Sequence, residues 1–146
     1  MTTSVPVAIA DTSALIALFN NNDEHHAAMK NRMAYVGHLV VSPCVLTELD
    51  YLTATRQGPS SAGAVLGYIV SRAATGRWEI PEISAHLLAA RAVMGGYPSI
   101  GLTAAMNVVL ALRFRTDVIA TLDRKHFRMI RPLTPHDAFR LLPDDF

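Results

Sequence analysis

Cysteine, charge and long apolar runs are all scarce in this chain. Cys44 is its only cysteine, which excludes an intrachain disulfide and a cysteine metal cage and fits a reducing cytosol. The N-terminus has no basic segment followed by an uninterrupted apolar core, and the apolar run 104–112 is too short to span a membrane. Repeats, linkers and low-complexity segments are also absent. These absences predict a soluble, unexported, cytoplasmic protein that does not associate with a membrane.

Charged residues make up only 17% of the chain, whereas hydrophobic residues make up 51% of its 146 residues. Much of the chain must therefore lie in a core, and disorder is not expected. We expect one domain over residues 1–146, which is long enough to bury a substantial core. The formal net charge is +1, but six of the 13 Lys and Arg residues fall between Arg113 and Arg131. Any basic face is therefore local.

The stretch from Val7 to Leu18 predicts a buried strand, a tight turn and a helix. Asp11 interrupts the apolar run, so it stands at the carboxyl end of a core strand, where open α/β sheets bind ligands. A buried ionised carboxylate is costly unless it is paired, hydrogen-bonded or bound to metal. The alternative is that Asp11 only caps the helix. Thr12 and Ser13 are expected to accept hydrogen bonds from the first turn of that helix.

The chain as a whole alternates predicted helices with short predicted strands. Helices are expected over 12–19, 24–33, 43–56, 62–73, 84–94 and 103–114, and strands over 7–10, 39–41, 78–80 and 117–122. This alternation favours a parallel sheet covered by helices. The adjacent His25 and His26 would point to different faces of a helix, so they make a poor metal pair and are expected to be structural or exposed.

Three further residues stand out on the predicted elements. Asp123 ends a second core strand, as Asp11 ends the first. Glu48 lies on the flank of the apolar stripe of its helix and is directed partly inward, although a Glu that only reaches water is the alternative. The helix over 103–114 is apolar nearly all round, and Asn107 is its only polar interior residue.

If the strands before Asp11 and Asp123 are parallel and central, their carboxylates share one edge of the sheet. Converging carboxylates repel each other unless a hard divalent cation binds there. With Mg²⁺ or Mn²⁺, the natural chemistry is metal-activated hydrolysis of a phosphodiester. Arg124 and Lys125 would then hold phosphates of the polymer, unless they form only a solvated basic face.

Four motifs, in order along the chain, carry a resemblance to a known family. They are Asp11-Thr12-Ser13-Ala14-Leu15, Glu48 in Thr-Glu-Leu, the Gly-Leu-Thr-x-Ala-x-Asn-Val-Val-Leu-Ala helix and Thr-Leu-Asp-x-x-x-Phe. Together they resemble a PIN-domain ribonuclease, and more narrowly a VapC-type toxin of a bacterial type II toxin-antitoxin system. The resemblance covers nearly the whole chain.

The resemblance implies a PIN-like α/β fold, with a short parallel sheet flanked by helices on both faces, usually as a homodimer. It implies an endoribonuclease that uses Mg²⁺ or Mn²⁺ to cleave structured RNA, such as tRNA or rRNA, and so inhibits translation. It also implies a VapB-type antitoxin, which lays a helix in a groove and sends a basic side chain to the acids.

The family's acids can be placed on this chain motif by motif. Asp11 matches the first acid, Glu48 the second and Asp123 the fourth. Asp11 and Asp123 are the expected metal ligands, and Glu48 is expected to orient the attacking water. Ser13 is expected to support the acidic cluster through a hydrogen bond.

The chain departs from the family pattern at Ala104, where the family has its third acid, in the first turn of the core helix. Loss of this central metal ligand is expected to weaken metal binding and depress activity. The other intact motifs favour a deliberate Asp-to-Ala change. A natural pseudoenzyme and a substitute ligand, Asn107, are the alternatives.

Two other classes of function stay open. The first is a catalytically inactive module that binds an antitoxin without RNA turnover, which alanine at position 104 favours. The second is a phosphotransferase with an aspartate nucleophile. That class normally has a second Asp two residues after the first, where this chain has Ser13.

Overall fold

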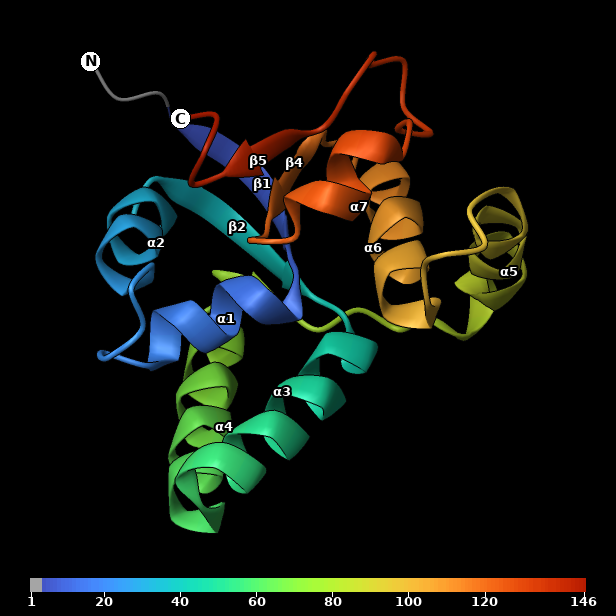
Figure 1. Ribbon diagram of the computed structural model, residues 1–146. Helices are drawn as coiled ribbons and strands as arrows, with labels where there is room; N and C mark the ends of the chain where they lie inside the picture. Colours follow the sequence, from blue (N-terminus) through green and yellow to red (C-terminus); the bar gives the residue numbers. More distant parts are fainter. Residues whose placement is uncertain (1–3) are drawn as a thin grey trace.

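A parallel β-sheet forms the centre of the structure, a computed structural model that describes residues 4–146 (Figure 1). Its strands are β1 (Val5–Ala10), β2 (Val36–Val41), β3 (Trp78–Glu79), β4 (Val118–Ala120) and β5 (Arg140–Leu142). The strand order is β3-β2-β1-β4-β5, and all neighbouring strands run parallel. The first strand of the chain therefore lies in the middle of the sheet.

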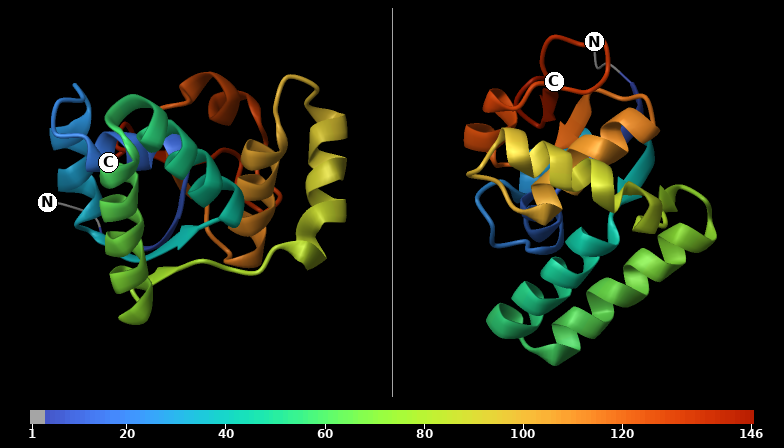
Figure 2. Two further views of the ribbon diagram at one scale, coloured as in Figure 1. Left: turned by 90° about the horizontal axis from the view of Figure 1, so that it is seen from below. Right: turned by 90° about the vertical axis from the view of Figure 1, so that its right-hand side faces the viewer.

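Helices connect these strands and cover both faces of the sheet. They are α1 (Thr12–Phe19), α2 (His26–Met33), α3 (Pro43–Gln57), α4 (Pro59–Ala74), α5 (Leu87–Gly96), α6 (Leu102–Arg113), α7 (Arg124–Met129) and a short 3₁₀ helix, η1 (Ser84–His86). One face packs against α1 to α4 and the other against α5 to α7, and the α3–α4 hairpin projects beyond the sheet (Figure 2). This arrangement confirms the expected α/β fold with helices on both faces. Between residues 4 and 146, no helix is long and apolar enough to cross a bilayer.

Residues 8–10 of β1 are buried on both faces of the sheet, which explains why this part of the strand is entirely apolar. Successive side chains of a strand point to opposite faces. Ala8 and Ala10 belong to the core beneath α1 to α4, whereas Ile9 belongs to the core beneath α5 to α7. Asp11 continues the strand, and its backbone N–H donates to the carbonyl oxygen of Ala120 at 2.9 Å. Consequently β1 and β4 end side by side at one edge of the sheet, as the sequence predicts.

Some elements differ from the sequence prediction because tertiary contacts decide where they begin. The second strand begins at Val36 instead of residue 39, since it pairs with β1 from that residue onward. Helix α2 begins at His26 instead of residue 24. The sequence does not predict β5 or α7, which are short and depend on contacts with distant parts of the chain.

Asp117 and Arg140 join β4 to the edge strand β5 through a bidentate ion pair. Arg140 donates from Nε to Oδ2 of Asp117 at 2.8 Å and from Nη2 to Oδ1 at 3.0 Å. Asp117 is only 7% exposed. Burial raises the pKa of its carboxyl, but the hydrogen bonds and charge of Arg140 outweigh that effect, so the pKa of Asp117 is lowered overall.

We expect Asp117→Asn to lower the free energy of unfolding at about pH 7 by about 1–3 kcal/mol, because it removes the charge of a buried carboxylate that pairs with the half-exposed Arg140. A lowered folded-state pKa gives stabilisation that is present above the unfolded value of 3.8 and is lost as the pH falls through the folded value. Urea unfolding at about pH 7 and about pH 3 measures the free energy of unfolding of both proteins. The difference in this free energy between the unchanged chain and Asp117→Asn should shrink in acid. An equal loss at both pH values would contradict the assignment. Asp137→Asn, at an exposed position, is the control.

Candidate active site

A cleft of about 650 Å³ opens where β1 and β4 end. Its walls come from α1, α3 and α6, with the start of α7 closing one side. Five of the residues singled out in the sequence line it together: Asp11, Ser13, Glu48, Ala104 and Asp123. Folding therefore brings the three distant acids to one place, together with Ala104, where the family resemblance predicts an acid.

Asp11 is the most buried of these acids, at 9% exposed. Its Oδ2 accepts hydrogen bonds from the hydroxyl of Thr121 at 2.7 Å and from the hydroxyl of Ser13 at 3.4 Å. Its Oδ1 accepts a hydrogen bond from Nδ2 of Asn107 at 3.3 Å. Asp11 is the N-cap residue of α1, but its side chain makes no capping hydrogen bond. The alternative that Asp11 only caps the helix is therefore wrong.

The surroundings of Asp11 disfavour its ionised form. Burial raises the pKa of Asp11, and the hydrogen bond from Thr121 offsets this only in part. The negative charges of Asp123 and Glu48 raise this pKa further. Asp11 is thus close enough to Asp123 and Glu48 to be repelled by both, and a bound cation would relieve that repulsion.

Ser13 ties the end of β1 to the loop after β4. Its Oγ accepts a hydrogen bond from the backbone N–H of Leu122 at 2.9 Å and lies 3.3 Å from Oγ1 of Thr121. The Oγ1 atom of Thr12 has no hydrogen-bond partner in the part of the chain that the structure describes. The expectation that Thr12 and Ser13 cap α1 is therefore wrong. A distant backbone group takes the Ser13 hydroxyl instead.

Asp123 is held in place by the first turn of α7. Its Oδ1 accepts a hydrogen bond from the backbone N–H of His126 at 3.1 Å, and its Oδ2 lies 2.8 Å from Nδ1 of the same histidine. His126 also lines the cleft, and sequence reasoning misses it. The spacing Asp-x-x-His could have revealed it, because an N-cap side chain and the third helical residue are neighbours.

Glu48 lies on the exposed part of the cleft wall. Its Oε2 accepts a hydrogen bond from the hydroxyl of Thr103 at 3.1 Å. This contact joins α3 to the first turn of α6. Glu48 therefore reaches water and faces the cleft at once, whereas Asp50 on the same helix does not line the cleft.

Ala104 and Asn107 lie one turn apart on α6. Ala104 is in the first turn and lines the cleft. Asn107 is fully buried and is the polar member of an otherwise apolar set of buried α6 residues. It donates to Asp11, but its Oδ1 finds no hydrogen-bond partner within residues 4–146. A buried oxygen without a donor suits a water molecule or a cation.

Arg124 and Lys125 are exposed at the start of α7 and lie outside the cleft lining. Arg124 donates to both carboxylate oxygens of Asp144, with Nη2 at 3.1 Å from Oδ1. Over residues 4–146, Lys125 takes part in no ion pair. The two expected phosphate-binding residues are therefore placed beside the cleft.

Asp11 and Asp123 offer the hard oxygen ligands that Mg²⁺ and Mn²⁺ prefer. Mg²⁺ is usually bound through one or two carboxylates and keeps several waters, so this pair fits the ion. Among the described residues, no group of three His, Cys, Asp or Glu side chains is arranged to hold a metal. His25 and His26 lie outside the cleft. Nδ1 of His26 lies within hydrogen-bond distance, 2.9 Å, of a backbone carbonyl oxygen of α1.

Comparison with known proteins shows which family the chain belongs to. Residues 8–131 match the PIN domain. The chain belongs to the PIN-domain family. This PIN domain is 43% identical over 129 residues to ribonuclease VapC26 of Mycobacterium tuberculosis, a match that covers 86% of this chain and 93% of that protein. The VapC-type resemblance of the four motifs is thereby confirmed.

Two solved structures share the fold of this PIN domain. The first is VapC20 of Mycobacterium tuberculosis, a sarcin-ricin loop cleaving toxin, with a TM-score of 0.68 and 18% identity over 82% of this chain and 91% of that one. The second is VapBC2 of Rickettsia felis bound to a DNA fragment from its promoter, with a TM-score of 0.65 and 16% identity over 92% of this chain and 98% of that one. At these identities the likeness shows the fold alone.

Proposed function

We propose that this PIN domain is a VapC-type endoribonuclease toxin that cleaves structured RNA, such as tRNA or rRNA, and so inhibits translation in the cytoplasm. The observation that carries the proposal is the convergence of Asp11, Glu48 and Asp123 in one cleft. The 43% identity to ribonuclease VapC26 supports it. The sarcin-ricin loop cleaving toxin VapC20 has the same fold and agrees with a structured RNA as substrate.

In this proposal, Asp11 and Asp123 would hold Mg²⁺ or Mn²⁺. When bound, the ion supplies an activated water and stabilises negative charge that develops at the phosphate. Thr121 and Ser13 keep the Asp11 carboxylate in one orientation through their hydrogen bonds. Glu48 would orient the attacking water from the exposed side of the cleft. His126 fixes the position of Asp123, the second of these ligands.

Alanine at position 104 lowers the expected activity of this chain, because the cleft lacks the family's third acid. The same feature favours a second candidate function, an inactive PIN module that binds an antitoxin without RNA turnover. The two candidates differ in whether cleavage returns when the acid is restored.

The test compares cleavage of a broad panel of structured RNAs by this chain and by Ala104→Asp, with Mg²⁺, Mn²⁺ or EDTA. Metal-dependent cleavage by the variant supports the ribonuclease. A failure of both proteins to show metal-dependent cleavage over the panel would falsify that assignment. Tight antitoxin binding without turnover by Ala104→Asp would instead support the inactive module. Sequencing of RNA ends after brief induction of the variant identifies the target.

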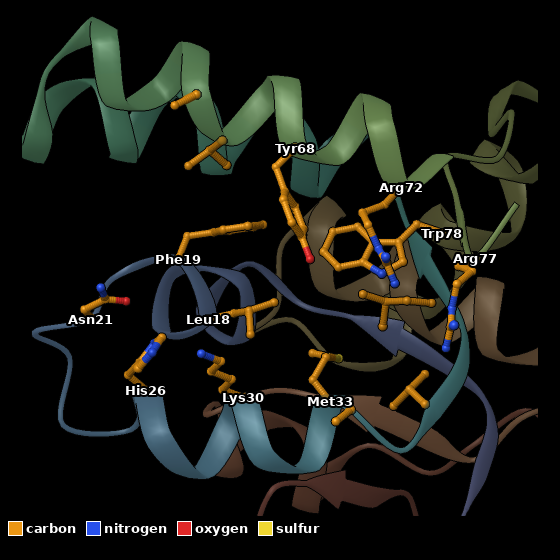
Figure 3. Close-up of a pocket in the computed structure, with 15 residues that line it drawn as sticks. Leu18, Phe19, Asn21, His26, Lys30, Met33, Tyr68, Arg72, Arg77 and Trp78 are labelled. Atoms are coloured by element: carbon orange, nitrogen blue, oxygen red, sulfur yellow. The ribbon is translucent and has the colours of Figure 1, made fainter. Parts of the chain in front are cut away.

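We also propose that a VapB-type antitoxin neutralises the toxin by laying a helix in a second hollow of about 600 Å³, between α1, α2, α4 and β3 (Figure 3), and by sending a basic side chain to the acids of the cleft. Its lining combines aromatic rings with cationic side chains: Phe19, Tyr68, Trp78, Lys30, Arg72 and Arg77. The ring centroid of Tyr68 lies 5.4 Å from that of Phe19 and 5.7 Å from that of Trp78. Such a surface suits an amphipathic helix that carries acidic side chains.

Ala64→Glu is expected to weaken antitoxin binding by about 10- to 100-fold, because it adds bulk and a negative charge to the wall of that hollow. Ala64 is exposed on α4 and lines the hollow. Titration calorimetry with the cognate antitoxin measures the change. Val70→Glu is the matched control, since Val70 is 60% exposed on the same helix and does not line the hollow. Equal affinities for the two variants would place the antitoxin elsewhere.

A homodimer is part of the proposal as well. Leu88 is 78% exposed and Leu87 is 46% exposed on α5. An apolar hollow of about 440 Å³ lies between the same helix and the segment 131–133. Large exposed apolar side chains gathered on one helix are typical of an interface.

A further inference from the structure

Two acids that follow β5 lie against the basic side of α7. Arg128 donates from Nη1 to Oδ2 of Asp145 and from Nη2 to Oδ1, both at 2.7 Å. Arg124 donates to both oxygens of Asp144. Each guanidinium of this helix is therefore held by a carboxylate in a two-point contact.

The two arginines form a strip that begins beside the candidate active site. Arg124 directly follows Asp123, and Arg128 lies one turn further along α7. Residues four apart share one face of a helix. Asp123 and His126 line the cleft, so this α7 arginine strip leads away from it. If an RNA bound in the cleft extends along α7, its phosphate backbone would contact the arginine strip.

Both ion pairs are open to solvent. The side chains of Arg124 and Arg128 are 50% and 45% exposed, and those of Asp144 and Asp145 are 26% and 27% exposed. Exposed ion pairs contribute little to folding stability. Phosphate offers a guanidinium the same two-point geometry as a carboxylate. A phosphate can therefore replace either acid at small cost.

The acids are held differently, which allows them to be tested separately. Asp145 is anchored, because its Oδ2 also accepts a hydrogen bond from the backbone N–H of Leu141 at 2.7 Å. The side-chain hydrogen bonds of Asp144 in the described structure all come from Arg124. The hydrogen bonds from Arg124 and Arg128 lower the pKa of Asp144 and of Asp145, so both acids carry charge at neutral pH.

We propose that Asp144 and Asp145 occupy the α7 arginine strip in place of RNA phosphates, and that a bound RNA must displace them. The inference rests on the proposed ribonuclease function and adds a regulation of its RNA-binding surface. The acids mask the strip against weak, non-specific contacts with nucleic acid. An RNA that also fits the cleft gains enough contacts to displace them.

The experiment measures binding of a fluorescently labelled RNA hairpin to the full chain in EDTA, over a series of salt concentrations. Asp144→Asn/Asp145→Asn is expected to bind about 3- to 10-fold more tightly at about 0.1 M salt. The slope of log affinity against log salt should steepen by about one to two, because more phosphates are neutralised. Glu82→Gln/Asp137→Asn removes the same charge from two exposed residues that form no ion pair with Arg124 or Arg128. Its affinity should stay within about twofold of the unchanged chain.

Further variants show whether the gain comes from the strip itself. Arg124→Gln/Arg128→Gln, added to the double Asn variant, should remove the gain. Asp144→Asn alone should still tighten binding by about two- to threefold, and it keeps the test valid if loss of the Asp145 anchor prevents folding. Circular dichroism reports whether each variant is folded.

Affinity of the double Asn variant equal to or below that of the charge control would overturn the inference, since the acids would then orient the arginines instead of masking them. If Ala104→Asp cleaves RNA while the double Asn variant gains no affinity, the inference fails and the ribonuclease assignment stands. If no variant binds RNA and Ala104→Asp does not cleave it, both fail.

Discussion

Ala104→Asp is expected to raise metal-dependent RNA cleavage by about 100- to 1000-fold over the present chain. Position 104 lies in the first turn of α6 and faces the cleft that holds Asp11 and Asp123. A carboxylate there would complete the set of acids with which the family binds its metal. The N-terminus of α6 also favours a negative charge in its first turn. The cleft, at about 650 Å³, has room for the side chain.

Initial cleavage rates over a range of Mg²⁺ concentrations measure this effect, and titration calorimetry with Mn²⁺ measures metal affinity without any substrate. Ala104→Asn is the matched control, because it has nearly the same shape without the charge. It is expected to recover less than about a tenth of the gain. Equal rates for the two variants would show that the restored side chain acts through packing instead of charge.

Asp11→Asn, made in the Ala104→Asp background, is expected to lower cleavage by about 100- to 1000-fold and to stabilise the fold by about 1 kcal/mol. Activity falls because a neutral amide replaces a metal-binding carboxylate. Stability rises because Asp11 is 9% exposed and faces two other acids, so its charge is costly without a cation. The amide can also donate to the unpartnered Oδ1 of Asn107.

Thermal unfolding in EDTA measures the stability change, which corresponds to a rise in Tm of about 3–6 °C. Asp50→Asn removes the same charge from an exposed position of α3 outside the cleft, so neither cleavage nor Tm should change. A lower Tm for Asp11→Asn would contradict the conclusion that the charge of this buried carboxylate destabilises the fold without a cation. Unchanged cleavage would remove Asp11 from the metal site.

Local patterns predict much of the fold. The apolar run that ends at Asp11 predicts β1, and the all-round apolar helix over 103–114 predicts the buried α6. These predictions succeed because a strand or helix buried on every side needs an apolar residue at nearly every position. The same logic predicts that Asp11 and Asp123 lie together, since each follows a central parallel strand. Family resemblance, not periodicity, assigns Glu48 to the site and predicts an acid at the position where this chain has Ala104.

Other parts of the site have no local signature. Thr121 is the nearest hydrogen-bond partner of Asp11, yet one hydroxyl after a strand resembles many others. Ser13 looks like a helix cap in sequence, but the backbone of Leu122 takes its oxygen. The acids at 144 and 145 resemble a solvated tail until α7 and β5 are folded. Each role depends on a partner that packing supplies.

The sequence by itself determined most of the strands and helices, and it determined that an acid follows both β1 and β4. These are properties of neighbouring residues, and periodicity records them. Only the tertiary structure decided what holds Asp11, because Asn107 and Thr121 lie 96 and 110 residues away along the chain. Only it placed the acids after β5 on the arginines of α7. Contacts between residues that are distant in sequence follow from how whole helices and strands pack. The pattern of neighbouring residues carries no information about which distant residue a side chain will contact.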